Sequence, residues 1–222
     1  MKSSQKVKYY SPAEERLNIT SHAAGFFLSI VALFLLYSRA SSDGDIWAIV
    51  SFSIFGFSLI ILYAASTVYH SVKEPALRNR LRVLDHAAIY ILIAGTYTPF
   101  TLVTLQAADA GRTGWIIFAV SWGMAVSGIV LKLFFTGRFT LLSTLMYVFM
   151  GWIIVFAIDP LVANLPPGGL YWLIAGGLAY TLGAVLYAIK KIKFNHAIFH
   201  IFVLLGSFCH FIAVYSYVLP VR

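Results

Sequence analysis

Seven long apolar runs constrain this chain more than any other feature of its sequence. A bilayer core of about 30 Å is crossed by roughly 20 helical residues, and each run has about that length. The runs lie near residues 22–40, 46–70, 84–106, 113–134, 139–159, 169–190 and 196–219. The chain is 60% hydrophobic and 11% charged, whereas soluble proteins are about half apolar and about a quarter charged. We therefore expect an all-α integral membrane protein, in which a seven-helix transmembrane bundle forms one domain over 22–219 after an N-terminal segment at 1–21.

The basic residues predict how this bundle is oriented. With the N-terminus in the cytoplasm, all of the 16 Lys and Arg residues except Arg39, Arg112 and Arg222 fall on the cytoplasmic side. The positive-inside rule then places the N-terminus inside and the C-terminus outside. The net charge of +8 is thus a topology signal and a source of affinity for anionic lipid, and it requires no nucleic-acid partner.

The N-terminal residues carry no sign of a cleavable signal peptide. The stretch MKSSQKVKYYSPAEERLN is polar over too great a length, and no small-residue cleavage site follows a short apolar core. We therefore expect the first span to serve as an anchor. The single cysteine, Cys209, excludes an intramolecular disulfide.

Four ionisable residues from distant parts of the sequence are expected at the cytoplasmic face. His70 ends the second span, Asp85 begins the third, and His196 and His200 begin the seventh. Because successive spans alternate in direction, these span ends lie at one depth. Ionisable groups inside membranes are costly to bury and tend to be functional. Their convergence therefore marks a candidate site.

Metal binding is the chemistry that this set of residues favours. His196 and His200 are four residues apart and share one helix face, about 6 Å from each other, as in helical zinc sites. His70 would complete three histidine ligands and leave the fourth tetrahedral position for water, as in catalytic zinc centres. Such zinc lowers the pKa of its water to about 7, and Asp85 could orient that water or take its proton. Ser66, four residues before His70, could orient that histidine or hydrogen-bond a substrate carbonyl.

Two of these residues also have a purely structural interpretation. Asp85 could form an ion pair with Arg82 one turn earlier, at the membrane interface. Ser66 could bond to a carbonyl of its own helix, as serines in helices commonly do. The case for a site therefore depends on the whole set and not on either residue alone.

The other three histidines are expected to be structural. His22, His86 and His210 are interpreted as polar bridges or packing residues between helices. His210 lies about 15 Å further along its helix than His200 and cannot bind the same ion.

At the candidate positions the chain resembles the hemolysin III family, the bacterial branch of the progestin and adiponectin receptor (PAQR) superfamily. The matching stretches are EERLNITSHAAG (14–25), ASTVYHS (65–71), LDHAAIYILIAGTYTPF (84–100) and NHAIFHIFVLLGSFCHF (195–211). They contain a Ser-x-x-x-His motif (Ser66, His70), an aspartate in the third span (Asp85) and a His-x-x-x-His motif (His196, His200). The resemblance implies a multi-pass protein of the bacterial inner membrane with its N-terminus inside. It also implies zinc held by the three histidines, with Asp85 on the bound water.

The resemblance suggests two activities. The wider superfamily resembles alkaline ceramidases and is linked to lipid-amide hydrolysis, whereas the family name comes from cell lysis attributed to some members. We favour a zinc-dependent hydrolase of a lipid amide, with a membrane lipid as its substrate or ligand. In this mechanism Asp85 would handle the proton and Ser66 would stabilise the oxyanion. The sequence specifies neither the lipid nor the oligomeric state.

Other classes of protein compete with this interpretation. A membrane receptor or a sensor of stress or lipid homeostasis would hold structural zinc with four protein ligands. A bis-histidine haem carrier could use His70 and His200, but a second histidine four residues away fits zinc better. A retinal pigment needs a Schiff-base lysine, which the seventh span lacks, and an inward N-terminus argues against the topology of G-protein-coupled receptors.

Overall fold

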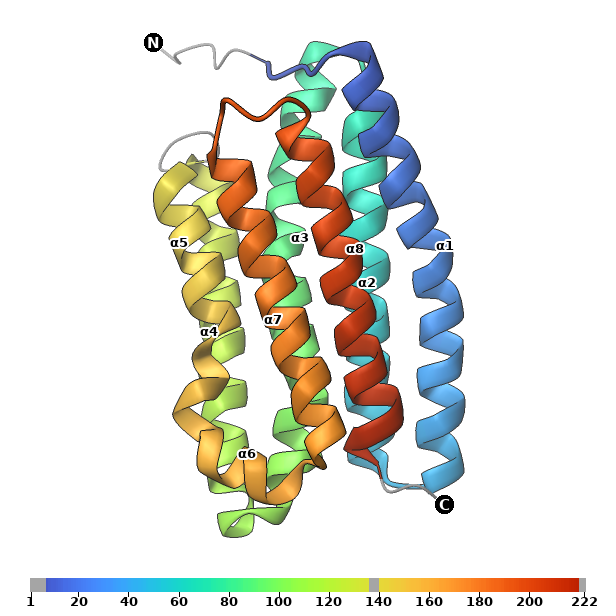
Figure 1. The fold of residues 1–222 in the computed structure, drawn as a ribbon, viewed down its shortest axis with the longest axis vertical. Coiled ribbons are helices and arrows are strands. Elements are labelled where there is room, and N and C mark those ends of the chain that lie inside the picture. Colours follow the sequence, from blue (N-terminus) through green and yellow to red (C-terminus); the bar gives the residue numbers. More distant parts are fainter. Residues whose placement is uncertain (1–6, 136–139, 220–222) are drawn as a thin grey trace.

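The computed structural model describes residues 7–135 and 140–219, and this part of the chain contains helices and no strand. The helices are α1 (Pro12–Asp43), α2 (Ile46–Ser71), α3 (Pro75–Leu102), α4 (Arg112–Phe135), α5 (Thr140–Gly151), α6 (Ile158–Asn164), α7 (Pro167–Ala188) and α8 (Asn195–Ala213). These helices are joined or extended by short turns. Three are 3₁₀ turns, η1 (Thr104–Ala107), η2 (Asp109–Gly111) and η3 (Ile153–Ala157), and one is a π-helical turn, η4 (Val214–Val218). The long helices form an elongated bundle (Figure 1). The predicted break at 136–138 lies outside the described residues.

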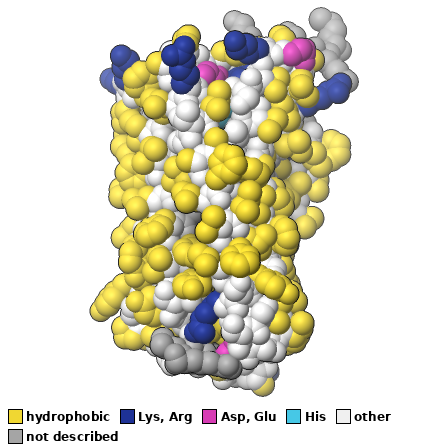
Figure 2. Space-filling view, turned by 90° about the vertical axis from the view of Figure 1, so that its right-hand side faces the viewer, with side chains coloured by type: hydrophobic (Ala, Val, Ile, Leu, Met, Phe, Trp, Pro, Cys, Tyr) yellow, Lys and Arg dark blue, Asp and Glu magenta, His cyan; other side chains and the backbone are white. Residues whose placement is uncertain are grey.

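Seven segments of the described chain are long and apolar enough to cross a membrane, as the apolar runs predict. The fifth crossing, Leu142–Asn164, is made of α5, η3 and α6, because the backbone leaves α-helical geometry at Trp152. Large apolar side chains cover the outside of the bundle: Phe34, Phe134 and Phe156 are 69%, 75% and 77% exposed. Figure 2 shows a broad hydrophobic belt, with Lys and Arg gathered mainly at one end of the molecule. The predicted seven-helix membrane bundle is therefore confirmed.

Two helices begin well before their apolar spans. α1 begins at Pro12, where Ser11 accepts a hydrogen bond from the backbone N–H of Glu14. α3 begins at Pro75, and the carboxylate of Glu74 accepts from backbone N–H groups of the first turn. Proline at the first helical position and an acceptor just before it are helix-start signals, whereas hydropathy marks only the part that crosses lipid. The first turns of α1 therefore belong to the bundle, although they fall within the polar segment at 1–21.

Four helix ends that carry polar residues meet at one end of the bundle. α1 packs against α2 and α8, α2 against α3, and α7 against α8. The start of α1, the end of α2 and the starts of α3 and α8 lie at the upper end in Figure 1, and we call this the upper end. Buried apolar side chains, including Phe52, Phe55 and Phe100, fill the space between helices. The assignment of the upper end to the cytoplasm stays a prediction from the basic residues.

Candidate metal centre

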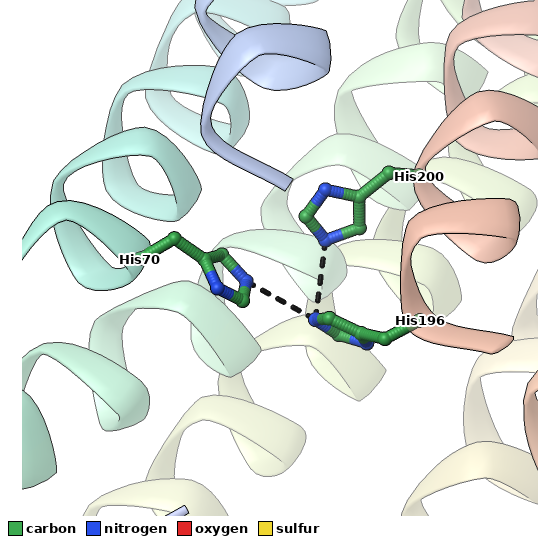
Figure 3. Close-up of side chains that lie close together, drawn as sticks. All are labelled: His70, His196 and His200. Carbon is green, nitrogen blue, oxygen red and sulfur yellow. Dashed lines mark hydrogen bonds between the residues drawn. The ribbon is translucent and has the colours of Figure 1, made fainter. Parts of the chain in front are cut away.

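Three histidine side chains meet at the upper end of the bundle. His70 lies in the last turn of α2, and His196 and His200 lie in the first two turns of α8. The Nε2 atom of His196 is 3.1 Å from Nε2 of His70 and 3.2 Å from Nε2 of His200 (Figure 3). All three side chains are buried. Three potential ligand nitrogens from two helices therefore face one another in the interior.

The spacing of these nitrogens fits a bound metal ion. One nitrogen from each histidine lies within 4.8 Å of the other two. In a tetrahedral site with zinc–nitrogen bonds of about 2.0–2.1 Å, neighbouring ligand nitrogens are about 3.3 Å apart. The two short separations of 3.1 and 3.2 Å are close to that value. Neutral imidazoles suit zinc and several other divalent transition metals, so this group of residues could hold a metal.

Glu15 of α1 orients the ring of His70. Its Oε2 atom is 2.7 Å from Nδ1 of His70, the distance of a charge-assisted hydrogen bond donated by the ring N–H. With its proton on Nδ1, His70 presents the lone pair of Nε2 to His196 and His200. Metal-binding histidines commonly donate their second N–H to a carboxylate, which fixes the tautomer and makes the ligand more basic. Glu15 therefore supplies the outer partner that a metal centre of this kind requires.

Arg78 of α3 stabilises the helix end that carries His70, and it is only 2% exposed. Its guanidinium group pairs with Oε1 of Glu15. It also donates hydrogen bonds to the backbone carbonyl oxygens of Tyr69, His70 and Val72, at 3.2, 3.3 and 2.9 Å. The last carbonyls of a helix lack helical partners, so these bonds satisfy the C-terminal end of α2. The charge of Arg78 also holds the Glu15 carboxylate in place.

Glu14, the residue before Glu15, holds the start of α8. Its Oε1 atom accepts a hydrogen bond from the backbone N–H of His196 at 3.3 Å. α8 follows Phe194, whose φ of 59° is left-handed and whose side chain provides no cap. A carboxylate at a helix N-terminus satisfies a free N–H and interacts favourably with the helix dipole. The first turn of α1 therefore contacts both helices that carry the histidines.

Aromatic contacts hold the two histidine rings of α8. The ring of Tyr10 stacks on His196, with centroids 4.5 Å apart and planes inclined by 6°. The ring of His22 stacks on His200, at 3.5 Å and 11°. Burial raises the pKa of Tyr10, so its hydroxyl stays protonated at neutral pH. Neither ring nitrogen of His22 has a hydrogen-bond partner among the described residues, so His22 acts here by stacking and not as a hydrogen-bonded bridge.

Asp85 and Ser66 lie close to the histidines but in different surroundings. Asp85 of α3 is 8% exposed and borders an internal cavity. Ser66, one turn before His70 on α2, is 1% exposed and lies next to Asp85, but it does not border the cavity. Its hydroxyl has no hydrogen-bond partner among the residues that the structure describes. Asp85 is therefore placed to meet a ligand, whereas Ser66 can act only through a neighbour.

The cavity has a volume of about 380 Å³ and extends from the histidines into the bundle. His196, His200 and Asp85 border it at the upper end, and side chains of α3, α5, α7 and α8 form most of its wall. Most of that wall is apolar. Val155 and Ile174 line the cavity and are also 48% and 39% exposed, so the wall there is part of the outer surface. A cavity of this size and character can hold a small molecule or part of a lipid chain.

The two remaining histidines lie outside the group of three. His210 stacks on Tyr180, with centroids 5.5 Å apart, and lies against Gly176, where an added Cβ would be 2.5 Å from the ring. Packing thus accounts for its position, and the three-residue metal group does not include it. His86 follows Asp85 and borders the cavity, and its Nδ1 has no hydrogen-bond partner among the described residues.

The sequence interpretation identified the histidines but assigned no role to Tyr10, Glu14 or Glu15. All three fall within 1–21, which hydropathy alone separates from the bundle. The available signal was the serine and proline at 11–12, which together predict a helix start and hence an extension of the first span. That extension places paired glutamates at the depth of the histidines.

The chain matches known proteins over nearly its whole length. The protein-family model described as "Haemolysin-III related" matches residues 10–211. "Hemolysin-3" of Bacillus cereus is 47% identical over 93% of this chain and 93% of its own, and the "Hemolysin-3 homolog" of Bacillus subtilis (strain 168) is 45% identical over 94% and 96%. The human "Monocyte to macrophage differentiation factor" is 28% identical over 94% of this chain and 87% of its own. The resemblance drawn from the short motifs is therefore confirmed.

Proposed function

This chain belongs to the haemolysin-III-related family, and we propose that it is a zinc-dependent hydrolase of the bacterial inner membrane that cleaves an amide bond in a membrane lipid. One observation carries the proposal: histidine nitrogens at metal-ligand spacing lie at the end of a mostly apolar cavity, beside the carboxyl group of Asp85. A structural zinc site is closed by four protein ligands and needs no such space, whereas a catalytic site keeps one position open.

The three histidines would hold the ion and leave that position directed to the cavity. When bound, zinc supplies Lewis acidity, which lowers the pKa of water to about 7 and polarises a carbonyl group. The chain's own residues prepare the site for it. Glu15 keeps His70 in the tautomer that presents Nε2, and the stacked rings of Tyr10 and His22 restrict the rotation of the other two ligands.

Asp85 is the residue that would move protons during hydrolysis. Its carboxyl group borders the cavity, so it can accept a proton from the attacking water and deliver it to the leaving amine. Ser66 lies next to Asp85 and away from the cavity wall. We therefore assign Ser66 to positioning this carboxyl group, in place of the contact with the substrate oxyanion that its sequence position suggests.

The apolar part of the cavity would hold the acyl chain of the lipid. The wall at Val155 and Ile174 is also part of the outer surface, which gives the chain a short route from the bilayer. An acyl chain in this position would exclude bulk water from the reacting carbonyl and place the amide close to the histidines.

Zinc analysis together with lipid-amide turnover by the purified protein tests this function. We expect nearly one zinc per wild-type chain, and loss of that zinc in His196→Ala and in His200→Ala. Asp85→Asn is expected to keep its zinc and to lose about 100-fold or more of the turnover, because general acid–base catalysis typically contributes that much. Asp159→Asn, an exposed aspartate changed in the same way, should keep both properties.

Each alternative predicts a different result in these assays. Zinc that persists undiminished in both histidine variants would contradict the site. Zinc without turnover of any amide in a lipid panel would favour a receptor or sensor with structural zinc.

The names of the two Bacillus relatives raise cell lysis as a second candidate function. Release of haemoglobin from red cells by the wild-type protein and by Asp85→Asn separates the two functions. Equal lysis by both proteins would show that lysis does not depend on hydrolysis.

A further inference from the structure

Lys132 is a buried charged residue that borders the same cavity as His196 and His200. It lies near the end of α4 and is only 5% exposed. Its ammonium group donates a hydrogen bond to the Oγ atom of Ser143 on α5 at 2.6 Å, and it lies 5.8 Å from the centroid of the Tyr147 ring. A lysine near a membrane interface usually extends its charge to water. Lys132 is turned to the interior instead.

Two more basic side chains lie nearby, on one face of α3. His86 borders the cavity, and its Nδ1 has no partner among the described residues. Arg82, one helical turn earlier, is 9% exposed and close enough to Lys132 for the two charges to interact. The hydroxyl of Tyr147 donates to the backbone carbonyl of His86 at 3.0 Å and so ties α5 to this face. The ammonium group of Lys132, the imidazole of His86 and the hydroxyl group of Ser143 therefore lie together at the upper part of the cavity, and they come from three helices.

We call Lys132, His86 and Ser143 the cation pocket. It is distinct from the metal centre, because its members lie on α3, α4 and α5, whereas the three histidines lie on α2 and α8. His196 and His200 border the same cavity as the cation pocket, and Asp85 and His86 are consecutive residues that also border it. One ligand in the cavity can therefore contact the histidine nitrogens and the Lys132 ammonium together.

We propose that the cation pocket binds the phosphate headgroup of an anionic lipid whose chain occupies the apolar cavity. The inference rests on the proposed function in so far as it names the headgroup class of the lipid cleaved there. Phosphate has several strongly accepting oxygens, which match the donors of Lys132, Ser143 and His86. Hydrogen bonds to a phosphate are stronger in a buried, water-poor site than at the surface. A neutral headgroup would bring no negative charge to the buried ammonium group of Lys132.

Binding of a fatty-alcohol phosphate and of its parent fatty alcohol tests the headgroup directly. Neither probe has an amide bond, so the result does not depend on turnover or on zinc. Binding is titrated with full-length protein in an uncharged, phosphate-free maltoside detergent. Brominated chains quench the fluorescence of Trp152, which lines the cavity, and Trp152→Phe gives the background. We expect the phosphate to bind roughly tenfold more tightly than the alcohol, the value of one good hydrogen bond to a charged group.

Three substitutions test whether Lys132 causes the preference for the phosphate over the alcohol. Lys132→Gln should bind both probes equally, with the affinity for the alcohol unchanged, which shows that the variant is folded. Lys132→Arg should retain most of the preference because it retains the charge. Lys191→Gln, which removes an exposed lysine between α7 and α8, should retain all of it.

Three results would overturn the proposal. The first is equal binding of the two probes to the wild-type protein. The second is a preference that survives in Lys132→Gln, because the charge responsible would then lie elsewhere. The third is displacement of the lipid probe by inorganic phosphate as efficiently as by unlabelled lipid phosphate, which would assign the pocket to free phosphate. A preference that depends on Lys132 in a protein without zinc or turnover would refute only the proposed function.

Discussion

Replacing Glu15 with glutamine tests whether the first turn of α1 tunes the metal centre. Oε2 of Glu15 lies 2.7 Å from Nδ1 of His70, and Oε1 pairs with Arg78. Glutamine has nearly the same size, and its amide oxygen can still accept the hydrogen bond from Nδ1–H. Because an amide has only one oxygen, its NH2 group takes the place of Oε1, and the substitution removes both the negative charge and the ion pair with Arg78. We expect His70 to become a less basic ligand and the affinity for zinc to fall.

The size of this effect follows from the geometry of the contact. Loss of the outer partner of a metal-binding histidine typically costs 10- to 100-fold in affinity, or roughly 1.4–2.7 kcal/mol. A separation of 2.7 Å indicates a fully formed charge-assisted bond, which favours a large effect. Two features reduce it: glutamine keeps an acceptor, and the Glu15 side chain is 16% exposed and therefore partly screened by water. We expect the lower half of the range, about 10- to 30-fold.

Competition for zinc between the purified protein and a chromophoric chelator measures the change. Glu14→Gln is the matched control, because it removes the same charge one residue away, and its Oε1 accepts from a backbone N–H of α8 and not from a ligand side chain. Its affinity should stay within about threefold of wild type. An equal loss in both variants would indicate a general charge effect. Unchanged affinity in Glu15→Gln, together with lost binding in His70→Ala, would refute the reasoning.

Three other measurements follow from the same contacts. His200→Ala is expected to lose its zinc by elemental analysis, whereas His210→Ala on the same helix keeps it. Arg78→Ala should lose about 3–5 kcal/mol of folding free energy, because it removes the ion-pair partner of the half-buried Glu15 carboxylate and takes this donor from four carbonyl oxygens, those of Lys8, Tyr69, His70 and Val72. Thermal unfolding should show a Tm lower by roughly 6 °C or more, while the exposed Arg80→Ala changes it little. Partial desolvation by neighbouring rings and the positive charge of Lys190 lower the pKa of Lys8 to about 8. The fraction of deprotonated amine, and with it the acylation of Lys8 in a short pulse, should therefore rise through this pH. Mass spectrometry should show that acylation of Lys8 rises at a higher pH in the unfolded protein than in the folded protein. The same pH dependence in both would contradict the lowered pKa of Lys8.

The crossings could be predicted because lipid imposes a length and a polarity on each of them. The secondary structure within a crossing could not be predicted in this way. The fifth is divided into α5, η3 and α6 at Trp152. A single glycine, Gly151, precedes that residue, but a lone glycine is tolerated in helices and does not by itself predict a break. Hydropathy reports the mean polarity of a segment, whereas a local change from α to 3₁₀ geometry depends on what packs against it.

The histidines could be predicted because alternation of the spans determines their depth. Depth alone says nothing about which side chains face one another across the bundle. Glu15 and Arg78 contact His70 from two other helices, so their roles depend on how α1 and α3 pack against α2. Lys132 illustrates the same limit, since a count of basic residues treats it as a topology signal whether it faces water or the cavity. Its position in the cavity wall becomes known only from the packing of α4 against the other helices.

The distribution of charge at the upper end of the bundle is compatible with both the proposed zinc centre and the proposed phosphate site. A divalent ion on three neutral imidazoles carries two positive charges, which the nearby carboxylates of Glu15 and Asp85 can offset. The cation pocket is formed by residues of α3, α4 and α5, so the ammonium group of Lys132 does not occupy the positions that contact the histidines. An apolar wall fixes how deep a lipid chain lies, but it does not fix the rotation of the amide about the chain axis. A phosphate on Lys132 would fix that rotation, because it anchors the lipid at a second point in the same cavity. The cation pocket would then contribute mainly to the orientation of the scissile bond, and the effect of Lys132→Gln on turnover should exceed its effect on lipid affinity.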